Sequence, residues 1–256
     1  MKAEALAKLR ARQAAPACLP AGLDTLPKHP SAAQFWSERA ASELAAVPAF
    51  SHTALALVRE SAVPDALATV AGIIADEVRH TELARALAEG LGGFVEDAGA
   101  GFSDAARLAR PHAGDLSHWL VTNGCVNETL SLAMLQARAK VARHPAVVEV
   151  LRSVARDEAV HARFCWQLAE VILPRQNEAA RGQLGVRVGS LLALLRRSVS
   201  TVGMAPEARA EARRVRSETA QAGLGALMPD DADALVETTI EETILPRLAA
   251  LSVVPC

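Results

Sequence analysis

The most constraining feature of the chain is one short pattern, Asp-Glu-x-x-His, that occurs at residues 76–80 and again at residues 157–161. In each copy the Glu and the His are three residues apart. On an α-helix this spacing places both side chains on one face, one turn apart. Each copy can therefore offer a carboxylate and an imidazole to the same site, provided that both segments are helical.

The rest of the chain also favours helices. Of its 256 residues, 51% are hydrophobic but only 3% are aromatic, and Ala, Leu, Arg and Glu fill long stretches. These residue types lose little rotamer freedom in a helix. Alternating segments of β-branched and aromatic residues, which are typical of strands, are missing. We predict an all-α fold.

Prolines, glycines and capping residues divide the chain into three parts. We expect a loosely ordered N-terminal arm (1–30), a metal-binding bundle (31–175) and C-terminal helices packed on the bundle (176–256). A glycine-rich connection would join the second and third bundle helices, which makes two antiparallel helix pairs linked by one long crossover. The expected segments are bundle helices at about 31–60 (with a kink or break near Pro48), 65–91, 115–143 and 146–173, a short helix near 103–108, and C-terminal helices near 183–199, 206–223 and 230–251.

The first and third bundle helices should each supply one further acidic ligand. The first helix offers Glu43 or Glu38. Glu43 lies seven residues after Trp36 within an apolar stripe, whereas Glu38 lies off that stripe. Glu128 interrupts the apolar face of the third helix in the same way. The predicted metal ligands are Glu43, Glu77, His80, Glu128, Glu158 and His161.

Burying four carboxylates together is costly unless cations compensate their charge. Two divalent metal ions would do so. A ligand set rich in carboxylates and poor in imidazoles suits iron or manganese better than zinc.

This order of ligands, Glu, ExxH, Glu, ExxH, resembles the ferritin-like di-iron carboxylate superfamily over about residues 31–173. The resemblance implies a ferritin-like four-helix bundle that binds two iron ions, or a manganese/iron pair. It also implies that Asp76 orients His161 and that Asp157 orients His80, because a carboxylate on the far imidazole nitrogen fixes the ring. A solvated position is the alternative for both aspartates.

The cysteines add a smaller prediction. Cys125 lies three residues before Glu128, and Cys165 lies four residues after His161, so both are candidates for a pocket beside the metals. Packing as small apolar side chains is the commoner role of a buried cysteine. The four cysteines show no pairing pattern, and free thiols are expected.

The resemblance implies a di-iron oxidoreductase that uses dioxygen. We expect an oxygenase or oxidase that hydroxylates or N-oxygenates a small organic substrate. Electrons would come from an external donor, because no flavin, nicotinamide or ferredoxin motif is present. A ferritin- or rubrerythrin-type protein that handles iron or consumes peroxide is the alternative, and a bundle that keeps metal without turnover is a third hypothesis. The chain has no Tyr, which excludes a tyrosyl radical, and it lacks the CxxC pairs of typical rubrerythrins.

The charge pattern limits the partners. The net charge is −2, and basic residues are interleaved with acidic ones, so neither nucleic acid nor a membrane surface is expected as a partner. No run approaches about 18 uninterrupted apolar residues. The charged start without an apolar signal core predicts a cytoplasmic protein. A homodimer is the default assembly.

Overall fold

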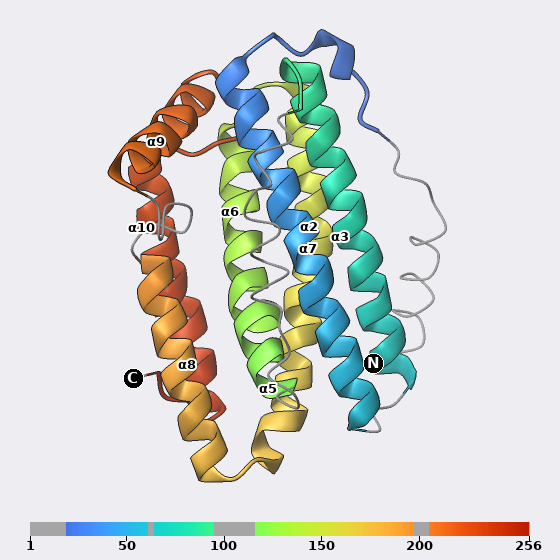
Figure 1. Cartoon of the computed structure of the whole chain (residues 1–256), viewed down its shortest axis with the longest axis vertical. Helices are drawn as coiled ribbons and strands as arrows, with labels where there is room; N and C mark the ends of the chain where they lie inside the picture. Colours follow the sequence, from blue (N-terminus) through green and yellow to red (C-terminus); the bar gives the residue numbers. More distant parts are fainter. Residues whose placement is uncertain (1–18, 61–63, 95–115, 197–204, 256) are drawn as a thin grey trace. The chain divides into compact units, whose positions relative to one another are not determined.

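The computed structural model describes residues 19–60, 64–94, 116–196 and 205–255 (Figure 1). The described residues are helical, with turns and short irregular segments and no strand among them, which confirms the all-α prediction. They group into two compact units, of which the first ends at Trp119 and the second begins at Leu120. Most of the expected crossover (92–114), with the short helix near 103–108, lies outside the described residues, as do residues 1–18 of the N-terminal arm.

The first unit is built on a helical hairpin of α2 (Pro30–Arg59) and α3 (Pro64–Leu91). The two helices lie side by side and run in opposite directions (Figure 1). The backbone N–H of His29, just before α2, donates to the carbonyl of Leu91 at the end of α3 (2.6 Å). At this end a Cβ on Gly90 would lie 2.7 Å from Leu26 Cδ1 and 3.1 Å from the carbonyl oxygen of Leu23, so a larger residue would require a shift of its neighbours. The unit also contains the 3-10 turn η1 (Leu23–Thr25) and α5 (Leu116–Trp119).

The start of α2 is capped by a histidine. The helix begins at Pro30, and the His29 side chain accepts a hydrogen bond from the N–H of Ala32 (3.1 Å). Proline suits this first position, because its missing N–H would have no helical partner there. The helix then runs through Pro48 without a break. Proline costs one backbone hydrogen bond, and the buried Phe50 and Leu57 beyond it hold the last turns against the core.

The second unit contains the other helix pair. In this unit the segment predicted as the third helix begins as a π-helix, η3 (Leu120–Asn127), and continues directly into α6 (Glu128–Val141). Its partner α7 (Pro145–Ile172) is antiparallel to it, since Thr129 of α6 bonds to Trp166 late in α7, and Ser131 bonds to Glu158 about two turns earlier. Trp166 Nε1 donates a hydrogen bond to Thr129 Oγ1 at 3.0 Å, so the N–H of this buried indole has an acceptor.

The C-terminal helices belong to this second unit. Its elements are η4 (Leu173–Arg175), α8 (Glu178–Arg196), α9 (Pro206–Gln221), α10 (Pro229–Thr239), the π-helix η5 (Ile240–Ile244) and α11 (Leu245–Ala250). α10 packs against both α6 and α8, and Arg196 of α8 forms an ion pair with Glu237 of α10 (3.0 Å). The loop after α9 is bound to the turn after α6, where the backbone N–H of Arg143 donates to the carbonyl of Gly223 (2.8 Å).

One described helix, α2, is long and apolar enough to cross a membrane by length and composition alone. The core helix of a soluble protein passes the same test, and α2 also carries the buried Glu43. The predicted location of the protein therefore stays a prediction.

Candidate metal centre

The first unit brings together three of the predicted ligands, Glu43 of α2 with Glu77 and His80 of α3. One ligand atom from each lies within 4.8 Å of those of the other two. The three residues are buried, with exposed fractions of 7%, 1% and 1%. Within α3, His80 Nδ1 lies 3.6 Å from Glu77 Oε2, as the three-residue spacing predicts. We call these three residues the first triad.

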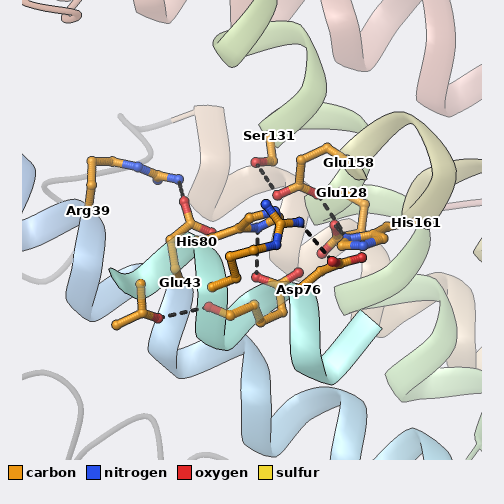
Figure 2. A network of polar contacts seen from close by, with 11 residues as sticks. Arg39, Glu43, Asp76, His80, Glu128, Ser131, Glu158 and His161 are labelled. Atoms are coloured by element: carbon orange, nitrogen blue, oxygen red, sulfur yellow. Dashed lines mark hydrogen bonds and ion pairs between the residues drawn. The ribbon is translucent and has the colours of Figure 1, made fainter. Parts of the chain in front are cut away.

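The second unit brings together the other three ligands, Glu128 of α6 with Glu158 and His161 of α7. His161 Nδ1 lies 3.5 Å from an oxygen of each glutamate. Ser131 Oγ donates to the other oxygen of Glu158 at 3.4 Å (Figure 2). All three ligands are buried, His161 completely. We call these three residues the second triad.

Each triad could hold a metal ion, and its donor atoms are of the kinds that bind divalent metals. In each triad, ligand atoms of two carboxylates and an imidazole lie within 4.8 Å of one another, in a region that is almost closed to water. Charged carboxylates are strongly disfavoured in such surroundings unless a cation or hydrogen-bond donors compensate them. A divalent ion compensates both carboxylates at once and uses the neutral imidazole as a third ligand.

Helix packing explains why these acids are buried. In α3 the apolar positions Val70, Ile73, Ala84 and Leu87 share one face with the two ligands, and all four are buried. α7 repeats this arrangement around its own pair of ligands. Because the flanking apolar residues must face the core, the acids between them must face it too.

The choice between Glu43 and Glu38 can be compared with the structure directly. Glu43 is buried and belongs to the first triad, whereas Glu38 is half-buried and accepts a hydrogen bond from Gln34 (3.2 Å) on the same helix. Glu43 also forms an ion pair with Arg39, one turn earlier on α2 (Figure 2). The sequence analysis missed the contact between Arg39 and Glu43, although the spacing of four residues on one helix was a usable signal.

The two aspartates before the motif glutamates are buried, with exposed fractions of 6% for Asp76 and 4% for Asp157. The alternative of a solvated position is therefore wrong for both. Asp76 Oδ1 accepts a hydrogen bond from Arg79 Nη2 at 2.7 Å. The proposed contacts of the aspartates with His161 and His80 stay predictions.

Cys125 and Cys165 are both buried free thiols of the second unit. Burial raises the pKa of each thiol well above its ordinary value, and the negative charges of nearby acids, including Glu128, raise it further. Both thiols are therefore neutral at physiological pH. Cys165 lies against the backbone of the π-helix, where a Cβ on Gly124 would fall 2.5 Å from its Sγ.

The π-helix is the main local feature that the sequence analysis missed. It ends at Asn127, and Glu128 is the first residue of α6. A π-helix widens the backbone and commonly occurs at functional sites. Here Gly124 lets the π-helix approach α7 closely, one turn before the ligand Glu128. No pattern of hydrophobic residues distinguishes this segment from an α-helix.

In comparisons with known proteins, the chain matches no family model, no curated protein and no solved structure.

Proposed function

We propose that the two triads combine into one dinuclear centre, and that the protein is a non-haem di-iron oxygenase or oxidase. The observation that carries the proposal is the repetition of one donor set, a buried Glu–Glu–His group, in each unit. The duplicated motif and the resemblance to the ferritin-like di-iron carboxylate superfamily support this proposal, in which the six predicted ligands would hold the two metal ions.

The donor types support iron. Four carboxylates and two imidazoles are hard to intermediate ligands, and zinc sites more often use cysteine and histidine. The two buried cysteines carry neutral thiols because their pKa values are raised, and a metal ligand would have to be a thiolate. A manganese/iron pair would use the same ligands.

The residues of the chain have three tasks in this proposal. The glutamates and histidines fix the positions of the metals, and the one-turn spacing of each ExxH pair sets the ligand geometry. Buried apolar neighbours such as Ile73 and Val154 exclude water from the site. Ser131 holds one carboxylate oxygen of Glu158 and so limits its rotation. Two bound iron ions would supply the electrons that reduce dioxygen.

The remaining parts of the proposal concern partners. A small organic substrate would be hydroxylated or N-oxygenated, and a separate reductase or cosubstrate would return the electrons. We propose a cytoplasmic homodimer as the working state.

Oxygen consumption tests the proposal. Anaerobic protein loaded with Fe(II) should consume dioxygen, and reductant together with an extract of small organic molecules should sustain turnover and yield an oxygenated product. Glu158→Gln should abolish this consumption, while Glu89→Gln, a change in an exposed ion pair on α3, should leave it intact. Iron oxidation that stops after one turnover, with no organic product under any condition, would favour an iron-handling protein instead.

A further inference from the structure

We propose that Trp166 is a positioning residue of the second triad, because its indole N–H links α7 to α6 beside the ligand Glu128, and that Arg247 of α11 strengthens this link. The inference rests on the proposed metal centre and adds residues that hold one of its ligands in place. All of the contacts that carry it lie within the second unit.

One hydroxyl group joins three elements next to the second triad. Thr129 Oγ1 accepts a hydrogen bond from Trp166 Nε1 of α7 (3.0 Å) and donates one to the carbonyl of Cys125 in the π-helix η3 (2.6 Å). An indole N–H can only donate and a hydroxyl has a single proton, so the direction of both bonds is fixed. Glu128 directly precedes Thr129 at the start of α6. A displacement of Thr129 therefore moves the backbone of Glu128.

Two hydrogen bonds between α6 and α7 lie on either side of His161 along α7. The bond of Trp166 lies beyond this histidine, and the bond of Ser131 to Glu158 (3.4 Å) lies before it. Sliding one helix along the other would break both bonds and would leave the buried indole N–H without its acceptor. His161 Nδ1 lies 3.5 Å from an oxygen of each glutamate of the triad, one on α6 and one on α7. The bond of Trp166 thus fixes the helix alignment on which these distances depend.

Arg247 brings a C-terminal helix into this arrangement. Its guanidinium carbon lies 5.2 Å from the centre of the Trp166 ring. A cation over an aromatic face is attracted to it, and it draws electron density from the indole, which makes the N–H a stronger hydrogen-bond donor. Arg247 is exposed, whereas Trp166 is buried. A surface residue of α11 is therefore connected to the start of α6 through one ring and one hydroxyl.

The consequence of losing this link is a weaker metal site that still has all its ligands. Metal sites require ligand distances within about 0.2 Å of their ordinary values. Outer residues that orient the ligands typically change metal affinity by about 10- to 100-fold. Without the bond of Trp166, the three ligands of the second triad remain, but Glu128 is no longer held at one position. The triad should therefore bind its ion more weakly.

The test is an anaerobic titration of the whole protein with Mn(II), in which electron paramagnetic resonance measures the free ion. Trp166→Phe keeps an aromatic ring but removes the N–H, and it should weaken by about tenfold or more the binding of the ion that Glu128→Gln abolishes. Thr129→Val should have a similar effect, whereas Thr129→Ser keeps the hydroxyl and should bind as wild type. The double variant Trp166→Phe/Thr129→Val should bind about as weakly as either single variant, because both changes remove the same bond.

Further variants separate positioning from stability. Leu192→Ala removes a buried side chain of α8 in the same unit, and it should lower the Tm without changing the affinity for Mn(II). Arg247→Gln should weaken the binding of the same ion by about twofold to fivefold, and Arg247→Lys should restore it, because a lysine can also lie over the ring. If Trp166→Phe fails to fold, the comparison of Thr129→Val with Thr129→Ser still tests the bond.

The failure of this inference differs from the failure of the proposed centre. Wild-type affinity in Trp166→Phe and Thr129→Val, or an equal loss in Thr129→Ser or Leu192→Ala, would overturn the role of Trp166 alone. Unchanged affinity in Arg247→Gln would overturn the role of Arg247. No binding of Mn(II) by the wild-type protein would contradict the metal centre itself.

Discussion

Replacing Glu158 by glutamine should have opposite effects on the metal-free and the metal-bound protein. Glutamine has the same shape as glutamate and can keep a hydrogen bond with Ser131, which lies 3.4 Å from the carboxylate. The change therefore removes one negative charge from the second triad with little disturbance of packing. It also removes a ligand that a divalent metal ion would need.

The size of the first effect follows from the geometry of the triad. The ligand atoms of Glu128 and Glu158 lie within 4.8 Å of each other. Two unit negative charges at that distance repel by about 3 kcal/mol at an effective dielectric constant of about 20. Removing one charge should raise the free energy of unfolding of the metal-free protein by up to about 3 kcal/mol. For a chain of this size that corresponds to a rise in Tm of up to about 6–12 °C.

The second effect follows from linkage. Metal at a concentration about 100 times its Kd stabilises the folded state by about 2.7 kcal/mol per site. Scanning calorimetry with and without Mn(II) should show this stabilisation in the wild-type protein, and Glu158→Gln should lose at least half of it. Glu89→Gln, on the exposed face of α3, should behave as wild type in both measurements. A lower Tm for metal-free Glu158→Gln, or an undiminished response to Mn(II), would refute the reasoning.

Three further predictions concern the surroundings of the second triad. Gly124→Ala would place a Cβ 2.5 Å from Cys165 Sγ, so it should cost about 1–3 kcal/mol in urea unfolding, and an unchanged midpoint would contradict the close approach. Thr129→Val leaves the buried indole N–H of Trp166 without its acceptor and should lower the free energy of unfolding by about 1–3 kcal/mol. Thr129→Ser keeps the hydroxyl and should keep most of the stability. Equal losses in both variants would rule out the hydrogen bond as the cause. Because burial raises the pKa of the Cys125 and Cys165 thiols, neither should react with a thiol reagent in the native protein at pH 8. Cys125→Ser and Cys165→Ser should therefore leave the native thiol titre unchanged, and a titre lower by one thiol would show that the substituted cysteine is accessible.

The bounds of several helices could be predicted because the helix-start residues and the positions of the apolar residues agree. Proline marks the start of α3 and α7 and helix formers fill both interiors, so their predicted bounds lie within one residue of those in the structure. Of the kink or break predicted near Pro48, the structure excludes the break, for a reason that lies outside the local sequence. Tertiary contacts of the residues beyond the proline, such as Phe50 and Leu57, hold the helix together despite the lost hydrogen bond.

The π-helix could not be predicted from periodicity. Its apolar residues suit an α-helix equally well, and the extra residue in its turn is accommodated by the contact of Gly124 with Cys165. That contact joins residues about 40 positions apart in the chain. A single sequence carries no local record of such a contact.

The triads were predictable because a buried acid in an apolar stripe is costly, and their four glutamates all lie in such stripes. Stripe position favours Glu43 over Glu38, and Glu43 is the buried one of the two. The polar partners of the ligands were less accessible to prediction. The contact of Ser131 with Glu158 depends on how two helices are aligned along their axes, which the sequence does not specify.

The most direct test of the account is the metal content of the protein, measured by elemental analysis after expression with supplemented iron and removal of loosely bound ions. The account predicts close to two metal ions per chain, falling towards one when His161 is replaced by glutamine and towards none when His80 is replaced as well. Less than one metal ion per chain in the wild-type protein, or two ions retained by the double variant, would contradict it.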